Sequence, residues 1–179
     1  MINEKQIVEQ LRNPKTCETA FSQIVREYQE PLYWQVRRMV LTHDDANDIL
    51  QNTFLKAWTK IDDFRGESRL STWLGRIAIN EALNFLERNR KTNSLDEEEN
   101  SLANTLVSDP YFDGDETQLL LQEAIRTLPH RQRMVFNMKY FEEKKYEEMS
   151  ELLDVSVGSL KASYHHAVKK ITDFFNQRD

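Results

Sequence analysis

Residues 64–80 combine aromatic, basic, hydroxyl and amide side chains, a composition suited to binding unpaired nucleic-acid bases. Aromatic rings stack on exposed bases, and cations hold the phosphate backbone. We expect the first four members of this set in a loop and the last four on one arc of the following helix: Phe64, Arg65, Ser68, Arg69, Thr72, Trp73, Arg76 and Asn80. The alternative is that Phe64 and Trp73 close a hydrophobic core, which is the commoner role for a single aromatic residue. The three arginines beside them favour the binding surface.

A second set of small, polar and basic side chains lies on one face, and on the flanks of that face, of a helix that we expect to begin near residue 157. Small, hydrogen-bonding and basic groups are what a helix uses to read bases and contact phosphates in the major groove of DNA. The set consists of Ser159, Lys161, Ala162, Ser163, His165, His166 and Lys169. An ordinary solvated face has the same composition, so the residues alone leave both interpretations open. We expect no metal site at the two histidines, because adjacent helical residues point about 100° apart and no cysteine or carboxylate stands at ligand spacing.

A third set, acidic and polar, occupies the start of a helix that we expect to follow residue 44. It consists of Asp44, Asp45, Asp48, Gln51, Asn52 and Lys56. Acidic residues near a helix N-terminus stabilise the helix dipole wherever they occur. The acidic residues therefore either only stabilise their own helix, or they form a surface that binds a basic partner protein.

Helices must position all three sets, because the apolar residues recur at helical spacing and no segment alternates like a strand. In the first half, Asp44 is the expected N-cap of one helix and Ser71 that of the next. Pro31 should kink an earlier helix or divide it in two. Glu81 interrupts an otherwise apolar stripe, and nothing in the sequence explains it.

Shorter helices are expected in the second half, over residues 119–128, 130–141 and 146–153, before the final helix. A break at residues 154–156 separates the last two, with Ser156 as the expected N-cap of the final helix. Two helices around a three-residue turn, the second of them amphipathic, match the helix-turn-helix motif. The sequence therefore predicts an all-α fold.

Charge divides the 179-residue chain into three parts. Residues 1–93 and 119–179 each carry a net charge of +1, whereas residues 94–118 hold eight acidic residues and no basic one, which accounts for the overall charge of −6. A segment this acidic repels itself and packs poorly. We expect two small helical domains, 1–93 and 119–179, joined by an acidic flexible linker at 94–118.

Composition excludes several classes of protein. The single cysteine, Cys17, cannot form an internal disulfide, no apolar run reaches the ~20 residues that span a bilayer, and the first residues lack the apolar core of a signal peptide. We therefore expect a cytoplasmic protein without direct membrane insertion. Glycine-rich phosphate loops, metal-ligand spacings and recognisable nucleophile–base pairs are missing, so we expect no enzymatic activity, no small-molecule substrate and no cofactor.

Longer strings in both halves are similar to one known family. DDANDILQNTFLKAW at 44–58 and FRGESRLSTWLGRIAINEALNFL at 64–86 resemble region 2 of bacterial RNA polymerase sigma factors. LPHRQRMVFNMKYFEEKKYEEMSELLDVSVGSLKASYHHAVKKI at 128–171 resembles region 4. These two regions joined by a short linker are typical of the extracytoplasmic-function (ECF) group of the sigma-70 family.

The resemblance implies a sigma factor that binds core RNA polymerase through its β′ and β subunits, directs it to promoter DNA and helps melt the −10 element. Region 2 would dock on a coiled coil of β′ through the surface formed by Asp48, Gln51, Asn52 and Leu55. The set at 64–80 would recognise the −10 element and hold a flipped base, and the polar face of the final helix would read the −35 element. An anti-sigma protein is a further implied partner.

The helix-turn-helix departs from the family's usual pattern at several positions. Lys145 stands where serine is usual, which removes an expected N-cap, and Asp154 stands where glycine is usual. Ser163, His166 and Val168 replace residues that are often arginine. Region 4 is therefore less basic than is usual in the family.

Two other non-enzymatic interpretations remain open. A conventional regulator that binds its operator as a dimer would explain residues 128–171 but leave the string at 64–86 without a role. An adaptor that uses its helices only for protein contacts, such as an antagonist of another sigma factor, would bind polymerase without opening promoters.

Overall fold

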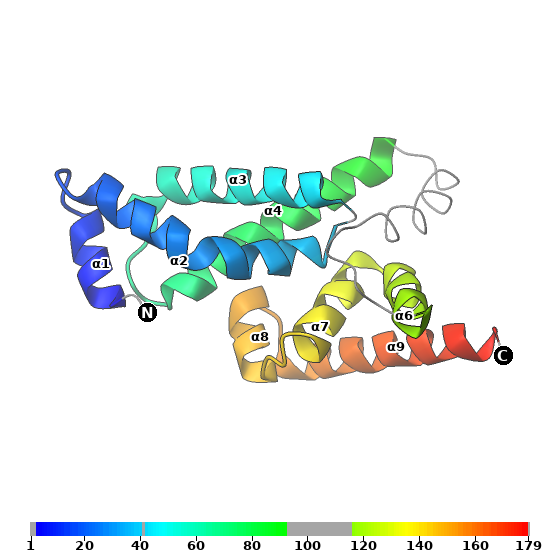
Figure 1. Ribbon diagram of the computed structural model, residues 1–179. Helices are drawn as coiled ribbons and strands as arrows, with labels where there is room; N and C mark the ends of the chain where they lie inside the picture. The colour runs from blue at the N-terminus through cyan, green and yellow to red at the C-terminus, as the bar shows by residue number, and fades with distance from the viewer. Residues whose placement is uncertain (1–2, 41, 93–115, 179) are drawn as a thin grey trace. The chain divides into compact units, whose positions relative to one another are not determined.

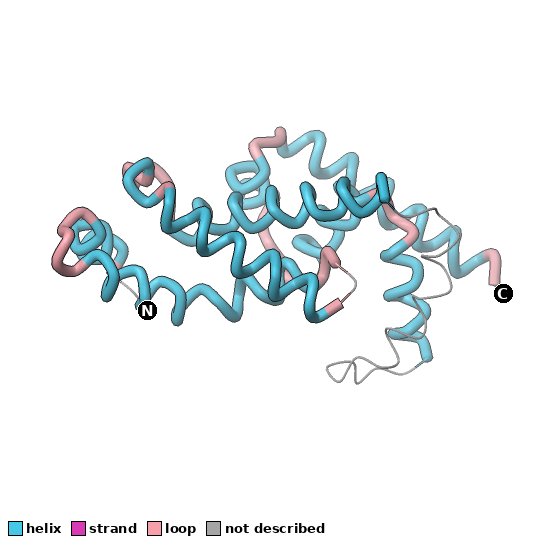
Figure 2. Tube along the Cα trace, turned by 90° about the horizontal axis from the view of Figure 1, so that it is seen from above, coloured by secondary structure: helices cyan, strands magenta, loops and turns pink. Residues whose placement is uncertain are grey.

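The computed structural model describes residues 3–40, 42–92 and 116–178. Every regular element within these ranges is a helix (Figure 1), and Figure 2 shows only helices and connecting loops in the same part of the chain. The predicted all-α fold is confirmed. Contacts divide the chain into two units, Met1–Phe85 and Leu86–Asp179. Most of the predicted acidic linker, residues 94–115, lies outside the described residues.

The first unit is made of long helices that share one core. It contains α1 (Glu4–Leu11), α2 (Cys17–Arg37), α3 (His43–Thr59), the 3₁₀ helix η1 (Ile61–Asp63) and α4 (Leu70–Thr92), which continues past the division between the units. Helix α2 packs against both α1 and α3, and Figure 1 shows α2 and α3 alongside one another. Ile24 and Val36 of α2, Ile49 of α3 and Leu74 of α4 are among the buried side chains. The helical spacing of apolar residues therefore does build this core.

Both expected helix starts in this unit lie two residues too far along the chain. The N-cap of α3 is Thr42, whose hydroxyl oxygen accepts a hydrogen bond from the Asp45 amide at 3.1 Å. Asp44 instead lies in the first turn, where its charge suits the helix dipole. Helix α4 begins at Leu70, a fully buried residue, so Ser71 is its second residue and not its cap.

Helix α2 remains one helix across Pro31. A proline removes one backbone hydrogen bond and crowds the preceding turn. Ile24 before it and Leu32 and Val36 after it are all buried, and this packing keeps both halves in one element. Of the two effects expected of Pro31, division of the helix is therefore excluded.

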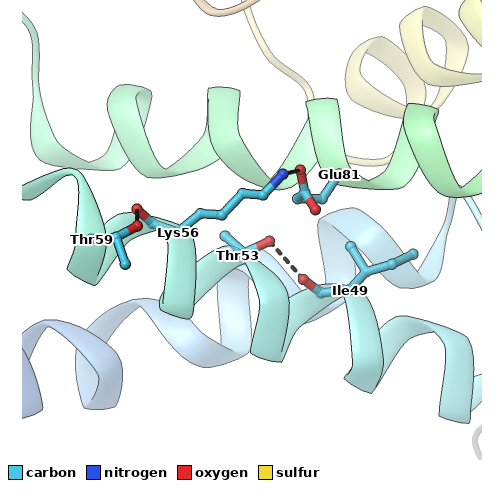
Figure 3. A network of polar contacts seen from close by, with 5 residues as sticks. All are labelled: Ile49, Thr53, Lys56, Thr59 and Glu81. Carbon is cyan, nitrogen blue, oxygen red and sulfur yellow. Dashed lines mark hydrogen bonds and ion pairs between the residues drawn. The ribbon is translucent and has the colours of Figure 1, made fainter.

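The unexplained Glu81 has a partner on the neighbouring helix. Only 8% of this residue is exposed, and its carboxylate accepts a hydrogen bond from the ammonium group of Lys56 in α3 (Figure 3). A buried carboxylate is tolerated when it is paired and hydrogen-bonded. The interruption of the apolar stripe on α4 is therefore an ion pair between α3 and α4.

The second unit packs three shorter helices against a long final one. These are α6 (Glu116–Arg126), α7 (His130–Tyr140), α8 (Tyr146–Leu153) and α9 (Val157–Asn176). Helix α9 contacts each of the other three. A core joins α6, α7 and α9 through Ala124, Ile125, Leu128, Phe136, Ala167 and Ile171. The helix predicted from residue 119 begins three residues earlier than expected.

The turn between α8 and α9 has the predicted helix-turn-helix form. Asp154 adopts the left-handed conformation with φ of 55°, which aspartate tolerates better than most residues. Ser156 is the N-cap of α9, as predicted, and its hydroxyl oxygen accepts from the Ser159 amide at 3.2 Å. At the start of α8, Glu148 accepts from the Lys145 amide at 2.9 Å. This is one of the two hydrogen bonds of a capping box. The other is missing, because the lysine side chain has no acceptor for a backbone amide.

A buried arginine holds the end of α6. The Arg133 guanidinium of α7 donates to the carbonyl oxygens of Arg126 at 2.6 Å and Leu128 at 3.3 Å. Carbonyls at a helix C-terminus lack partners within the helix and carry partial negative charge. A cation is well suited to satisfy them.

We predict that Arg133→Met destabilises the second unit by about 2 kcal/mol, because charged hydrogen bonds are lost while side-chain volume is kept. Hydrogen exchange followed by mass spectrometry should show faster exchange in α6 and α7. Arg131→Met, an exposed neighbour in the same helix, is the control and should leave exchange unchanged. Equal protection from hydrogen exchange in Arg133→Met and Arg131→Met would contradict a capping role for Arg133.

Among the described helices, none combines the length and the apolar character needed to cross a membrane.

Candidate nucleic-acid interface

The two aromatic residues predicted to bind bases differ in exposure. Phe64 is only 7% exposed, and the centre of its ring lies 5.1 Å from that of Trp73 in a tilted arrangement. Trp73 itself is partly buried. The Phe64 ring therefore packs in the core against Trp73, as in the alternative interpretation of this residue, and its predicted contact with a base stays a prediction. Of the two, Trp73 retains ring surface that a base can stack on.

The other members of this set lie on the loop before α4 and on α4 itself. Gly66 turns the loop with φ of 77°, a conformation that favours glycine. Arg65, Arg69, Arg76 and Asn80 are exposed, and Ser68 and Thr72 are partly buried. An aromatic ring with guanidinium groups on its loop and helix has the composition of a base-stacking platform.

The polar face of α9 lies at the surface, as a DNA-reading face must. Ser159, Lys161, Ala162, His165, His166 and Lys169 are exposed, and Ser163 is partly buried. The rings of His165 and His166 lie with their centres 6.0 Å apart. Groups of three or more metal-ligating side chains do not occur among the described residues. The opposite side of α9 contributes Leu160, Ala167 and Ile171 to the core.

Packing places further groups beside this face that sequence reasoning missed. The ammonium groups of Lys139 in α7 and Lys161 in α9 lie 5.0 Å and 5.7 Å from the centre of the Tyr146 ring. Lys139 also donates to the carbonyl oxygen of Lys144 at 3.2 Å. Because the three side chains come from three helices, no periodic pattern in the sequence could reveal the cluster.

A second tyrosine stiffens the interior of the same unit. The Tyr164 ring stacks against Phe136 with centres 5.8 Å apart, and burial raises the pKa of its phenol. The phenol therefore stays neutral at physiological pH. Tyr164 anchors α9 to α7 and is not part of the exposed face.

On α3, the structure brings the predicted polymerase-binding residues together at the surface. Asp48, Gln51, Asn52 and Leu55 recur at helical spacing, and all four are exposed. Leu55 is 64% exposed, more than any other large apolar residue in the part of the chain that the structure describes. Scattered exposed leucines are ordinary, but one that shares its arc with carboxylate and amide groups is suited to a protein partner.

Comparison with known proteins identifies both units. The family model for sigma-70 region 2 matches residues 24–92, and that for sigma-70 region 4 matches residues 118–171. The ECF RNA polymerase sigma factor SigW of Bacillus subtilis is 30% identical over 161 residues, covering 84% of this chain and 86% of SigW. The ECF RNA polymerase sigma-E factor of Haemophilus influenzae is 31% identical over 164 residues and covers 85% of each chain.

Solved structures share the fold. The sigma factor RpoE of Bartonella quintana, solved in complex with the anti-sigma factor NepR, has a TM-score of 0.67 at 21% identity and covers 87% of this chain and 96% of its own. CnrH, solved with the cytosolic domain of CnrY, has a TM-score of 0.67 at 19% identity and covers 98% of this chain and 99% of its own.

The fold and the two matched regions define a bacterial sigma factor of the sigma-70 family. Within that family, the chain belongs to the ECF group. It is therefore a transcription initiation factor that directs RNA polymerase to specific promoters.

Proposed function

We propose that residues 1–93 act as the region 2 domain, residues 119–179 as the region 4 domain and residues 94–118 as a flexible acidic linker between them. The α3 face of Asp48, Gln51, Asn52 and Leu55 binds the coiled coil of the β′ subunit. The set on the loop and α4 recognises the −10 element. The polar face of α9 enters the major groove at the −35 element, and the protein acts in the cytoplasm.

The arrangement around Trp73 carries this proposal. A partly exposed indole rests on a buried phenylalanine, with exposed arginines on the same loop and helix. Extruding a base costs a few kcal/mol, and a surface that binds only the extruded base offsets that cost. Melting then needs no nucleotide hydrolysis and no bond chemistry from this chain, which acts by binding and not as an enzyme.

An anti-sigma protein is a further proposed partner. RpoE of Bartonella quintana was solved with the anti-sigma factor NepR, and CnrH with part of CnrY. The exposed Leu55 face and the exposed face of α9 offer surfaces that such a protein could cover. A competition assay with core polymerase would detect it as a binder that lowers the fraction of chain bound to polymerase.

Footprinting with and without polymerase tests the proposed division of roles. Each domain carries a net charge of only +1, and affinity for duplex DNA scales with the number of phosphates neutralised. We expect little protection by the free chain at physiological salt, and protection of both promoter elements once core polymerase is added. A two-fold symmetric footprint of the free chain would favour the dimeric regulator instead.

Lys161 gives a local prediction for the −35 contact. Lys161→Ala should weaken recognition of the −35 element by about 1–3 kcal/mol if the ammonium group contacts a base. The measurement is transcription by the assembled holoenzyme from promoters that differ only at that element. Lys170→Ala, an exposed lysine on the same helix, is the comparison. An unchanged promoter preference would make Lys161 a solvated surface residue.

A further inference from the structure

We propose that the ion pair between Lys56 and Glu81 is a positioning link, which holds the polymerase-binding face of α3 and the promoter-binding face of α4 in the mutual orientation needed for promoter opening. This inference rests on the proposed function, because it concerns how the two proposed surfaces work together. Glu81 and Lys56 act through their neighbours and touch neither polymerase nor DNA in this proposal.

The pair spans two helices and is asymmetrically buried. The Lys56 side chain extends from α3 across to the Glu81 carboxylate on α4 (Figure 3). The Lys56 side chain is 50% exposed, whereas the Glu81 side chain is 10% exposed. The carboxylate is therefore fixed within the helix pair, and the lysine reaches it from the edge.

The surroundings of Glu81 show that burial alone does not account for this residue. Leu74, Ala78 and Ala82 of the same stripe are buried apolar side chains. Replacing a buried ion pair by apolar side chains of similar volume is often neutral or stabilising. Because the Lys56 side chain is half exposed, its ammonium group can be hydrated when Glu81 is replaced. An apolar residue at position 81 would then serve the core, and what the ion pair adds is a directional contact.

Nearby hydroxyl groups are already engaged elsewhere. Thr53 is fully buried and donates to the carbonyl oxygen of Ile49 at 2.8 Å, and Thr59 donates to that of Lys56 at 3.0 Å (Figure 3). Both contacts lie along the backbone of α3. Of the polar contacts drawn in Figure 3, the one that joins α3 to α4 is therefore the ion pair between Lys56 and Glu81.

Each partner of the pair is next to a proposed interface residue. Lys56 follows Leu55 in sequence, and Asn52 lies one turn before it, about 40° away around α3. Glu81 follows Asn80, while Arg76 and Thr72 lie about 140° and 180° away from it around α4. Glu81 thus faces α3, whereas the proposed promoter residues Arg76 and Asn80 on the same helix are exposed. Rotation of α3 or α4 about its axis would break the ion pair. It would also turn the polymerase-binding face of α3 relative to the promoter-binding face of α4.

The test uses the full chain assembled with core polymerase and measures two quantities. One is the affinity for core polymerase, and the other is the rate of promoter opening, followed with a fluorescent base analogue in the −10 element. The variants are Glu81→Gln, which keeps the shape, Glu81→Leu, which fills the core, Glu81→Lys alone, and the exchanged pair Lys56→Glu with Glu81→Lys. Glu87→Gln, an exposed glutamate on α4, is the matched control.

We expect Glu81→Gln and Glu81→Leu to slow opening by about tenfold, the size of effect found for residues that modulate coupling between two sites. Affinity for core polymerase and the thermal unfolding midpoint should change little, and Glu87→Gln should behave as the original chain. The exchanged pair should open promoters faster than Glu81→Lys alone. That recovery would show that the contact itself matters and not either charge.

Two results would overturn the inference. One is opening at the original rate in both Glu81 variants, and the other is a loss of opening fully matched by a loss of thermal stability. Trp73→Ala and Leu55→Lys are measured in parallel. If those two change neither opening nor polymerase binding, the proposed function itself fails. If they have their effects while the Glu81 variants have none, only the positioning link fails.

Discussion

Leu55→Lys should weaken binding of core RNA polymerase by at least about 30-fold, the effect typical of a central interface residue, without unfolding the protein. Leu55 is 64% exposed, so its side chain contributes little to the core of the first unit. In the proposed complex it is the apolar member of the α3 face, and Asp48, Gln51 and Asn52 continue that face toward the start of the helix. A lysine there removes the apolar contact and places an ammonium group where a basic partner is expected.

The measurement is a titration of labelled protein with core polymerase at fixed salt concentration. Gln29→Lys, which adds the same charge at an exposed position on α2, is the control and should bind within about twofold of the original chain, as exposed substitutions outside an interface do. Polymerase binding by Leu55→Lys at the original affinity would mean that the α3 face is not the docking surface.

Trp73→Ala should slow promoter opening by about 5- to 150-fold, because stacking of one base on an aromatic ring contributes about 1–3 kcal/mol and about 1.36 kcal/mol changes a rate tenfold. Binding of core polymerase should be affected far less, because Trp73 lies on α4 and not on the α3 face. Trp73→Phe keeps an aromatic surface above Phe64 and should retain much of the activity. The rate of opening and the affinity for core polymerase are measured on the same preparations.

Loss of a large side chain also weakens packing, so the control must share that loss. Trp34→Ala removes another partly buried tryptophan from the first unit, one whose ring centre lies 5.2 Å from that of Tyr33. It should lower stability without a selective effect on opening. Equal loss of opening and polymerase binding in Trp73→Ala would instead assign Trp73 to the core.

Local patterns in the sequence predicted most of the helices, because each depends on residues a few positions apart. The start of α9 is an example, since Ser156 caps the helix through the Ser159 amide. The start of α3 was predicted two residues too late, because Thr42 and Asp44 are both good capping residues and the structure uses the first. A propensity argument alone cannot choose between them.

Contacts between distant residues could not be predicted in this way. Glu81 was noticed because it broke a pattern, but its partner Lys56 lies 25 residues away on another helix. The burial of Phe64 likewise depends on how the loop folds onto α4. Resemblance to a family indicates which surfaces bind partners. The contacts that hold those surfaces in place, such as the Lys56–Glu81 pair and the buried Phe64 ring, are defined only by how the helices pack.

Run-off transcription with bacterial core polymerase on a library of promoter fragments tests the central claim most directly. We expect discrete transcripts that depend on this protein and that define both promoter elements at once. Polymerase binding without transcripts would favour an adaptor. If cognate polymerase gave neither transcripts nor binding, the account of this chain as a promoter-recognising subunit would be contradicted.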